Sequence, residues 1–401
     1  MNQPTKTINR LYILLAATLV VLFVGGFVHA GTAGHGKYHN KLVDCDKGDS
    51  LRKAVRRARS GTTVHVTGTC YERIVMKRDN VRIIGHDGAA IDGSTQPAGF
   101  VEFTPMVRIT DATGIRLKNL IVRHSPGEGI LVQGQASAKL RNIQVHQNAN
   151  TGLLVDQARV ELRNSKFDQN LSGVDATNNA SLILRGQVSA QSNLGLGFAV
   201  SNAASAELRG GVLNASSNQG FGVVVEGEQL AIFNFGVSQG SQIIADTNGA
   251  CGIALVAGGL VDIIAPPPLY FSGANQVSAQ HNGCGMLLTT GSRLESPFGA
   301  ATFQIANNQV GMQILGNSDV FVNGGLNVSN NATGMVADGA GTITLASADG
   351  SVAPLSSTIS GNAAIDAVMN FGSRATFGGN VSVGSLVCDG TALVRGTTTC
   401  P

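Results

Sequence analysis

Hydrophobic and polar residues alternate in short runs along most of this chain, the pattern of β-strands whose side chains point alternately to two faces. The clearest runs read "GIRLKNLIV", "SAKLRNIQV", "RVELRNSKF", "SLILRGQVS" and "SAELRGGVL". Each run has a Leu at the same place, at spacings of 23, 22, 22 and 24 residues. These residues are Leu117, Leu140, Leu162, Leu184 and Leu208. We expect them to stack into one buried column while the cations that follow them point outward.

A second repeating feature is an Asn followed three or four residues later by a Gly, at successive intervals of 22, 23, 25, 30, 34, 26 and 23 residues. The pairs are Asn148/Gly152, Asn170/Gly173, Asn193/Gly197, Asn218/Gly222, Asn248/Gly252, Asn282/Gly285, Asn308/Gly311 and Asn331/Gly334. A fixed feature at this period is typical of a solenoid built from stacked coils. At each corner we expect the Asn to adopt a left-handed backbone and to hydrogen-bond the Asn of the neighbouring coil. The Gly then lets the chain turn back.

Each repeat offers three short extended runs, which in the third repeat are Val160–Arg163, Ser165–Asp168 and Val174–Thr177. About 22 residues leave no room for a helix between strands. The pattern therefore predicts an all-β solenoid of about a dozen coils. One helix is expected before it, starting at Asp49 or Ser50 and ending at Gly61, where its apolar side would cover the open first coil.

Residues 61–387 resemble the right-handed parallel β-helix proteins of the pectin-lyase-like group, on the strength of the Leu column, the three runs per repeat and the Asn–Gly corners. The group includes secreted carbohydrate-binding and sugar-hydrolase β-helices. The resemblance implies a single-stranded right-handed parallel β-helix. It does not specify an activity, because many chemistries and non-enzymes share the fold.

The first 30 residues read as an export signal, with Lys6 and Arg10 ahead of an apolar stretch and a cleavage site at Val28-His29-Ala30. If it were retained, the same stretch would anchor the protein in a membrane. We expect an exported protein that is extracellular, periplasmic or at the cell surface. The predicted organisation is a leader and cap helix over residues 31–60, the β-helix over 61–387, and a closed end over 388–401.

Six Cys in an exported chain suggest three disulfides. Pairing in chain order would join Cys45 to Cys70, Cys251 to Cys284, and Cys388 to Cys400. Cys251 and Cys284 precede the corner Gly of consecutive repeats, and equivalent positions on neighbouring coils lie within disulfide reach. The alternative is that some of these residues are free buried thiols.

The formal net charge of +3 conceals an uneven distribution. Residues 1–210 hold 25 Lys or Arg against 15 Asp or Glu, whereas residues 211–401 hold 3 against 10. The cations that follow the Leu column should form one outward row on the basic half, and Arg116 and Lys139 join the same face, offset by Glu161 and Glu207. The row is Lys118, Arg141, Arg163, Arg185 and Arg209. It could grip the carboxylates of an acidic polysaccharide. Alternatively it is a solvated face whose Arg stems shield the sheet.

A second outward row, one strand later, would stack Arg123, His146 and Asp168. These three groups could abstract a proton from a uronate and stabilise the resulting charge. The alternative is a ladder of structural charge pairs.

Several chemical signatures are missing. No adjacent Asp–Asp pair occurs, and Asp156 and Asp175 stand apart from other carboxylates, so a calcium site is weak and no other metal or cofactor is indicated. There is no Trp to form a platform for neutral sugars. We expect a monomer with no nucleic-acid partner. Three functions remain: an exported β-helix that interacts with an acidic polysaccharide, a non-catalytic adhesive or matrix rod, and a polysaccharide lyase or epimerase.

Overall fold

The computed structural model describes residues 39–95, 104–227, 229–233, 240–264, 275–296, 301–323, 325–345, 356–378 and 381–396, together with residues 398 and 400. The chain divides into two compact units, Met1–Lys37 and Tyr38–Pro401, and all the described residues belong to the second. The predicted export signal over residues 1–30 lies outside them. No helix in the described part of the chain is long and apolar enough to span a bilayer.

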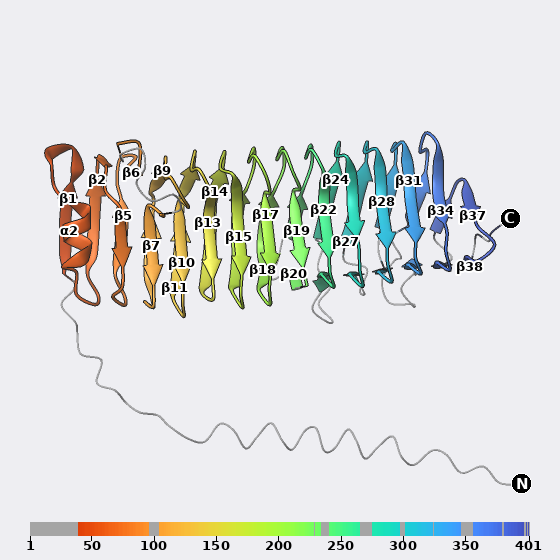
Figure 1. Ribbon diagram of the computed structural model, residues 1–401, viewed down its shortest axis with the longest axis horizontal. Helices are drawn as coiled ribbons and strands as arrows, with labels where there is room; N and C mark the ends of the chain where they lie inside the picture. The colour runs from red at the N-terminus through yellow and green to blue at the C-terminus, as the bar shows by residue number, and fades with distance from the viewer. Residues whose placement is uncertain are drawn as a thin grey trace, which may run out of the picture. The chain divides into compact units, whose positions relative to one another are not determined.

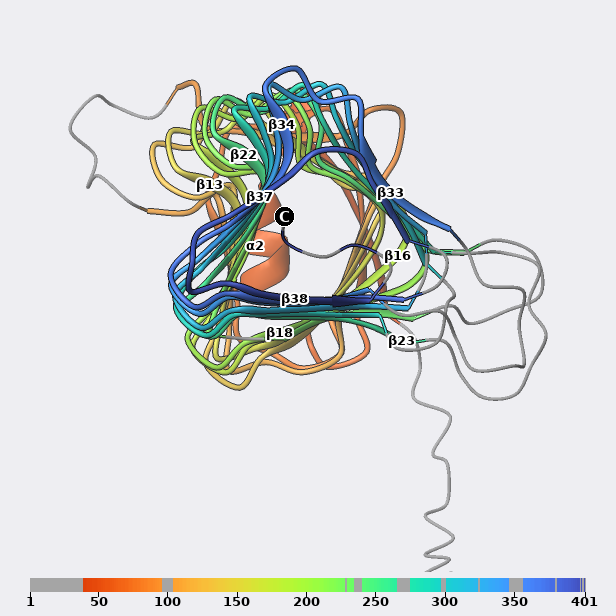
Figure 2. The same cartoon turned by 90° about the vertical axis from the view of Figure 1, so that its right-hand side faces the viewer.

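Short parallel strands, stacked coil upon coil, build this second unit (Figure 1). Each coil gives one strand to each of three faces, as β11 (Ser137–Arg141), β12 (Gln144–His146) and β13 (Thr151–Asp156) do in turn. Figure 2, which looks along the stack, shows the three faces surrounding the interior. We call them the first, second and third face in chain order.

The strands of the first face are β1 (Asn40–Asp44), β2 (Thr63–Thr67), β5 (Arg82–Gly85), β8 (Ile115–Lys118), β11, β14 (Arg159–Asp168), β16 (Ser181–Ser189), β18 (Ser205–Asn214), β20 (Gln229–Phe233), β23 (Leu260–Ile264), β26 (Arg293–Ser296), β29 (Asp319–Val322), β32 (Thr342–Leu345), β35 (Arg374–Phe377) and β38 (Leu393–Gly396). The second face holds β3 (Thr69–Cys70), β6 (Ala90–Asp92), β9 (Ile121–Arg123), β12, the second halves of β14, β16 and β18, β21 (Gln242–Ile244), β24 (Asn275–Gln280), β27 (Ala301–Ala306), β30 (Gly325–Ser329), β33 (Ser357–Ser360) and β36 (Val381–Val383). The third face holds β4 (Ile74–Met76), β7 (Val107–Thr110), β10 (Ile130–Gln133), β13, β15 (Ser172–Thr177), β17 (Phe198–Ser201), β19 (Val223–Glu226), β22 (Cys251–Val256), β25 (Cys284–Leu288), β28 (Val310–Leu315), β31 (Thr333–Asp338), β34 (Ile365–Met369) and β37 (Leu386–Cys388).

The predicted Leu column is confirmed. Leu117 pairs with Leu140, Leu140 with Leu162, Leu162 with Leu184, and Leu184 with Leu208, on five consecutive strands of the first face. All five side chains are buried. Because each Leu packs on the one above and the one below, a single coil cannot bury this surface by itself.

The Asn residues of the corners form a continuous ladder between the second and third faces. The backbone N–H and the side-chain Nδ2 of Asn193 both donate to Oδ1 of Asn218, each at 3.0 Å. The same backbone-to-Oδ1 bond links each predicted ladder Asn to the next, from Asn148 to Asn331. The predicted stacking of Asn on Asn is therefore confirmed, and buried amides that would otherwise be costly are paired.

The corner backbone differs from the prediction in two respects. The left-handed residue is the one before each ladder Asn, as at Gln147 (φ 57°), Gln169 (φ 59°) and Ser192 (φ 54°), and not the Asn. The corner Gly is needed for space rather than for a positive φ. A Cβ on Gly152 would lie 2.7 Å from Nδ2 of Asn170, closer than packed atoms come.

The ladder extends one coil further than the sequence pattern. Asn331 donates its backbone N–H to Oδ1 of Asn362 at 2.9 Å, and Asn362 in turn donates to Oδ1 of Asp366. Burial by itself raises the pKa of Asp366, but hydrogen bonds from Asn362 and Ser385 outweigh it and hold the pKa below its usual value. A carboxylate that only accepts hydrogen bonds ends the ladder.

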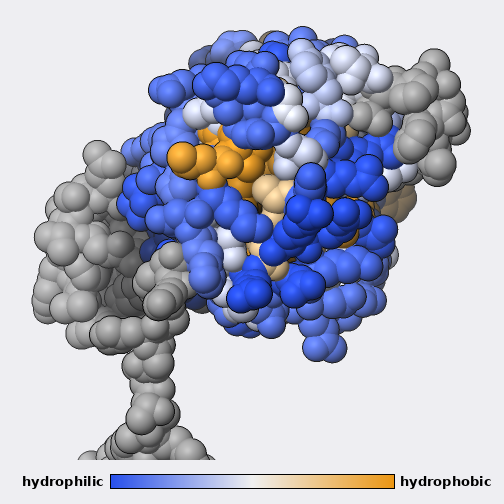
Figure 3. Space-filling model, turned by 90° about the vertical axis from the view of Figure 1, so that its left-hand side faces the viewer, coloured by the Kyte–Doolittle hydropathy of each residue, from blue (hydrophilic) through white to orange (hydrophobic). Residues whose placement is uncertain are grey.

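A short helix and an extra strand cover the first coil. Ser50 is the N-cap of α2 (Leu51–Arg56), accepting from the Lys53 N–H, and Leu51 and Val55 are buried. The helix stops at Arg56, well before the predicted Gly61, because the chain turns at Arg59–Thr62 to enter β2. Before it, the 3₁₀ helix η1 (Cys45–Lys47) follows β1. Seen from this end, a small hydrophobic area lies within a hydrophilic surface (Figure 3).

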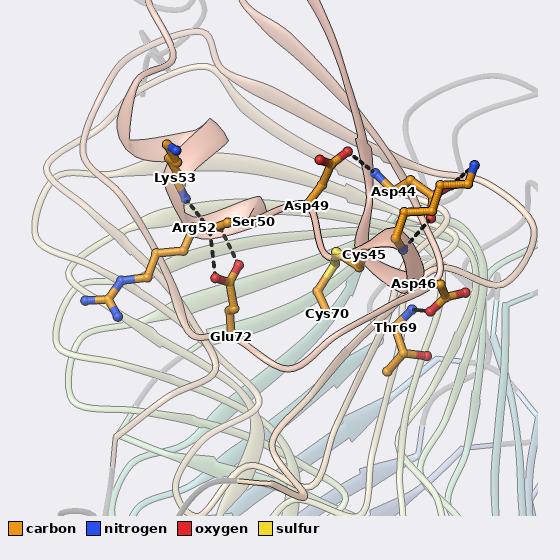
Figure 4. The surroundings of a disulfide bond; sticks show 11 residues. Asp44, Cys45, Asp46, Asp49, Ser50, Arg52, Lys53, Thr69, Cys70 and Glu72 are labelled. Carbon is orange, nitrogen blue, oxygen red and sulfur yellow. Dashed lines mark hydrogen bonds and ion pairs between the residues drawn. A yellow bond between two sulfur atoms is a disulfide. The ribbon is translucent and has the colours of Figure 1, made fainter.

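The structure joins Cys45 to Cys70, Cys251 to Cys284 and Cys388 to Cys400, which is the pairing in chain order. Figure 4 shows the first of these beside the helix start. There Glu72 accepts from the Ser50 hydroxyl at 2.7 Å and from the Arg52 N–H at 2.9 Å, so the coil caps the helix. The second disulfide joins residues that face each other in the register of β22 and β25.

Candidate functional site

A basic groove with a volume of about 290 Å³ lies on the first face, over β5, β8, β11 and β14. Ile84 is the outward-facing apolar residue of the lining, whereas the side chains of Ile83, Leu117 and Leu140 are buried beneath the groove floor. Six cations and one acid complete the lining. The charged residues are Arg82, Arg116, Lys118, Lys139, Arg141, Arg163 and Glu161.

The strand register arranges these charges in two parallel rows. In the inner row Lys118 pairs with Arg141, which pairs with Arg163. In the outer row Arg82 pairs with Arg116, Arg116 with Lys139, and Lys139 with Glu161. Parallel strands lie about 4.8 Å apart, so each row presents one charge per coil at that spacing.

Acidic residues form ion pairs with some of the cations on this face. Lys139 Nζ lies 2.6 Å from Glu161 Oε2, and Arg185 Nε lies 3.6 Å from the other Glu161 oxygen. Arg209 forms an ion pair with Glu207. No acid among the described residues forms an ion pair with Lys118, Arg141 or Arg163, so the inner row keeps its positive charge.

Glu161 is a paired carboxylate and not a proton donor. The hydrogen bond from Lys139 lowers its pKa, and the charges of Lys139, Arg185 and Arg163 add to that effect against the opposing effect of burial. The side chain is therefore ionised at neutral pH. Its role in the groove is to hold Lys139 and Arg185 in place.

Three of the five cations predicted for the binding row line the groove: Lys118, Arg141 and Arg163. Arg185 and Arg209 continue along the same face but lie outside the groove, where Glu161 and Glu207 pair with them. Sequence reasoning missed Arg82. Its strand carries Ile83 where later coils have Leu, and Ile83 lies 34 residues before Leu117, outside the regular spacing.

Further along the first face the outer row becomes acidic. The register continues from Glu161 through Ile183 to Glu207, and a later stretch pairs Asp262 with Glu295. Burial and the nearby charge of Glu295 raise the pKa of Asp262. The cations of the outer row that precede Glu161 are therefore those that line the groove.

The three residues predicted as a catalytic row lie at consecutive strand positions of the second face. His146 pairs in register with Arg123 on one side and Asp168 on the other. Their polar atoms are engaged elsewhere. Asp168 accepts from the Ser189 hydroxyl at 2.6 Å and the Gln191 N–H at 2.9 Å, and His146 Nδ1 lies 3.2 Å from Gln147 Oε1.

Arg123 is held by Asp92, a residue that the sequence did not single out. Arg123 Nε donates to one Asp92 oxygen at 2.7 Å, and His124 Nδ1 lies 3.0 Å from the other. The Asp92 side chain is only 3% exposed. Burial by itself raises its pKa, but hydrogen bonds from Ser94, His124 and Arg123 hold the pKa well below the usual range. Asp92 lies on the short strand β6, which precedes the repeats that align by sequence.

His146 lacks the environment of an activated base. Burial lowers its pKa, the positive charges of Arg123 and His124 lower it further, and Gln147 and Asp168 act in the opposite direction. The imidazole is neutral at pH 7, but the residues around it do not line the groove. In the described part of the chain no group of three or more His, Cys, Asp or Glu side chains is placed to hold a metal ion.

Comparison with known proteins shows similarity of fold. Residues 106–264 match the family model described as right handed beta helix region. The A-module of mannuronan C-5 epimerase AlgE6 from Azotobacter vinelandii is 15% identical, with a TM-score of 0.46 over 87% of this chain and 93% of that one. Pectate lyase Pel9A is 16% identical, with a TM-score of 0.38 over 79% and 80%. The Streptococcus pneumoniae surface adhesin PfbA is 9% identical, with a TM-score of 0.28 over 89% and 99%.

A search of curated protein sequences finds no match to this chain. The parallel register of the three faces and the match of residues 106–264 nevertheless agree with each other. This chain is a right-handed parallel β-helix, the fold that its resemblance to the pectin-lyase-like group implied.

Proposed function

We propose that the basic groove on the first face binds a linear acidic polysaccharide. The observation that carries the proposal is the inner row of Lys118, Arg141 and Arg163, which is in strict register and has no ion-pair partner among the described residues. Unpaired cations held side by side repel one another, and a polyanion laid along the row relieves that repulsion.

The type of cation supports carboxylates as the ligand. A guanidinium offers two parallel N–H donors that match the two oxygens of a carboxylate, and two of the three inner-row residues are Arg. Ile84 and the methylene stems of the cations themselves can contact the faces of sugar rings. The lining contains no aromatic residue, whereas sites for single-stranded nucleic acids usually stack bases on aromatic side chains.

The lining favours binding over catalysis. Its only carboxylate, Glu161, is paired with Lys139 and has a lowered pKa, so it is poorly suited to give up a proton to a leaving group. The predicted proton-transfer row of Arg123, His146 and Asp168 lies on the second face, and none of its three residues lines the groove. The function supported best is therefore that of an exported protein that recognises a polyuronate.

Removing two adjacent charges from the inner row tests this proposal. The variant Arg141→Gln/Arg163→Gln is expected to bind oligogalacturonate about 100-fold more weakly at low salt, because each charge-assisted contact contributes roughly 1.4 kcal/mol. Isothermal titration calorimetry at low and high salt measures the affinity, and the wild-type affinity should fall as salt rises.

The matched control is Arg374→Gln/Arg395→Gln, which removes two exposed charges from the far end of the same face. It should bind as the wild type does. A neutral cello-oligosaccharide should not bind to any of the three proteins. Equal loss of affinity in both double variants, or no wild-type affinity for oligogalacturonate and oligoalginate, would rule the groove out as the site.

A further inference from the structure

The third face carries an outward stripe that is apolar over most of its length. The stripe is the middle outward position of each strand from β4 to β37, and the pairings connect all 13 positions without a break. Only Arg108, Asp175 and Gln313 interrupt the aliphatic side chains. The larger members away from the ends are Leu131, Leu154, Val224, Leu287, Val336 and Val368.

The second face differs at the corresponding outward position over the coils from β24 to β36. The corresponding stretch of the second face runs through Ser278, Gln304, Asn327, Thr358 and Ser382 in continuous register. Both stretches point away from the interior, so coil geometry does not explain the difference. An aliphatic stripe on the outside of a polar solenoid is the kind of surface that mediates association.

Most of the stripe remains in contact with solvent, although Ala199 and Ala254 within it are buried. Val75 and Val387 at its two ends are 45% and 49% exposed, and the six larger members are partly exposed. Asp175 lies among them with its Oδ1 buried and without a hydrogen-bond partner in the described residues, and burial raises the pKa of this carboxyl. The surroundings of Asp175 are thus apolar even before anything binds.

Charge is distributed oppositely along the two halves of this unit. Residues 39–210 hold 22 Lys or Arg against 15 Asp or Glu, a formal charge of +7, and residues 211–401 hold 3 against 10, a formal charge of −7. The third face follows this trend only at its two ends, because Asp156 and Asp175 also lie on its strands within the basic half. Lys77, Arg78 and Arg108 lie at the β4 end, and Asp338 and Asp389 lie toward the β37 end.

We propose that two copies of this chain pack third face against third face in antiparallel orientation, with the stripes buried between them. Antiparallel packing places the basic half of each copy on the acidic half of the other, whereas parallel packing places like charges together. A two-fold axis relates the copies, so the same surface serves on both. This proposal is an alternative to the monomer expected from the sequence.

The stripe is large enough for a stable dimer. Thirteen strands about 4.8 Å apart extend over about 58 Å, and a band reaching two residues to either side is about 13 Å wide. The interface is thus on the order of 800 Å² per copy, the usual size for a specific protein complex. The groove on the first face stays outside the interface, so the dimer does not depend on the proposed binding function.

The two-fold axis predicts which residues meet. With full overlap, β19 at the centre of the third face lies opposite its own copy, and β4 lies opposite β37. Val224 of one copy therefore faces Val224 of the other, while Val387 faces Val75. All six native Cys are in disulfides, so a new Cys is the one free thiol in each chain.

Sedimentation velocity on the full-length protein tests the association, and oxidation of single-Cys variants with diamide tests its geometry. We expect a dimer, efficient cross-linking of Val224→Cys, and little cross-linking of Val387→Cys. Mixing Val387→Cys with Val75→Cys should restore the cross-link. Val224→Lys should weaken dimerisation at least about 100-fold, because it buries two like charges at the axis.

The control variant Asn327→Lys adds the same charge to the outward row of the second face and should leave the dimer intact. Circular dichroism verifies that each variant folds. A wild-type protein that sediments as a monomer at all concentrations would overturn the proposal. This holds equally if residues 1–38 prove to be what covers the stripe. Efficient self-cross-linking of Val387→Cys would also overturn it, since that result indicates parallel or non-specific association.

Discussion

Asn193→Ala is expected to lower the free energy of unfolding by about 3 kcal/mol, because it interrupts the ladder near its middle. Asn193 is fully buried, and its Oδ1 accepts from the Asn170 N–H at 2.9 Å while its own Nδ2 donates to Asn218. The Ala variant leaves the Asn170 N–H without an acceptor, at a cost of about 1–3 kcal/mol, and removes a further bond from Asn218.

Asn327→Ala is the matched control, because Asn327 lies at an outward position of β30 with an extended backbone, and its side chain donates to Gln304 Oε1 at 2.9 Å outside the ladder. It should change the stability by less than about 0.5 kcal/mol. Urea denaturation followed by circular dichroism measures both variants, and hydrogen exchange at the Asn170 amide reports the lost acceptor directly. Equal stability of the two variants would show that the ladder contributes nothing beyond ordinary polar contacts.

Cys251→Ala/Cys284→Ala is expected to have the other large effect, a loss of about 3.5 to 4 kcal/mol. The disulfide closes a loop of 33 residues between two adjacent coils, and its removal frees that loop in the unfolded chain. Both residues are nearly buried, so the native packing around them also loses contacts. Thermal and urea unfolding of the oxidised protein measure the effect.

The comparison variant is Cys388→Ala/Cys400→Ala, which opens a loop of 12 residues at the last coil. Coils of a solenoid interact mainly with their neighbours, so fraying of the last coil leaves the others folded. We expect the main transition to stay where it is, with faster hydrogen exchange confined to β37 and β38. If Cys251→Ala/Cys284→Ala also left the main unfolding transition unchanged, the expected stabilisation by the central disulfide would be contradicted.

Much of the fold could be predicted because the interior repeats. Leu140 and Leu162 occupy the same place in neighbouring coils, so a spacing in the sequence translates directly into a contact in space. The ladder of buried Asn was predictable for the same reason. Disulfide pairing followed from coil equivalence at Cys251 and Cys284, which lie opposite each other in the register.

Other features depend on local backbone detail that no repeat reveals. The left-handed residue is the one that precedes each ladder Asn. Gln, Ser, Thr, His and Asn all occur at that position, so the residue type does not identify it in the sequence. Asn362 was missed since it lacks the following Gly and ends on Asp366 instead. The helix was predicted too long because nothing in its apolar spacing shows that the chain turns at Arg59–Thr62.

The candidate site was predicted in part, and the limits are electrostatic. A row of outward cations could be placed from the sequence, but the sequence does not show which of them acids neutralise. The structure pairs Arg185 and Arg209 with Glu161 and Glu207, whereas Lys118, Arg141 and Arg163 form no ion pair with any described residue. Arg82 and Asp92 lie in the irregular early coils, where the spacing gives no alignment.

Carbodiimide coupling of oligogalacturonate to lysine, mapped by peptide mass spectrometry, tests most directly that the aligned coils form one polyanion groove. The reagent joins a sugar carboxylate to the nearest ammonium, so it reports where the ligand lies. Sugar adducts are expected on Lys118 and Lys139, which line the groove, and not on Lys166 of the second face or Lys53 of α2. Adducts spread evenly over the exposed lysines, or concentrated on Lys53 and Lys166, would contradict the account.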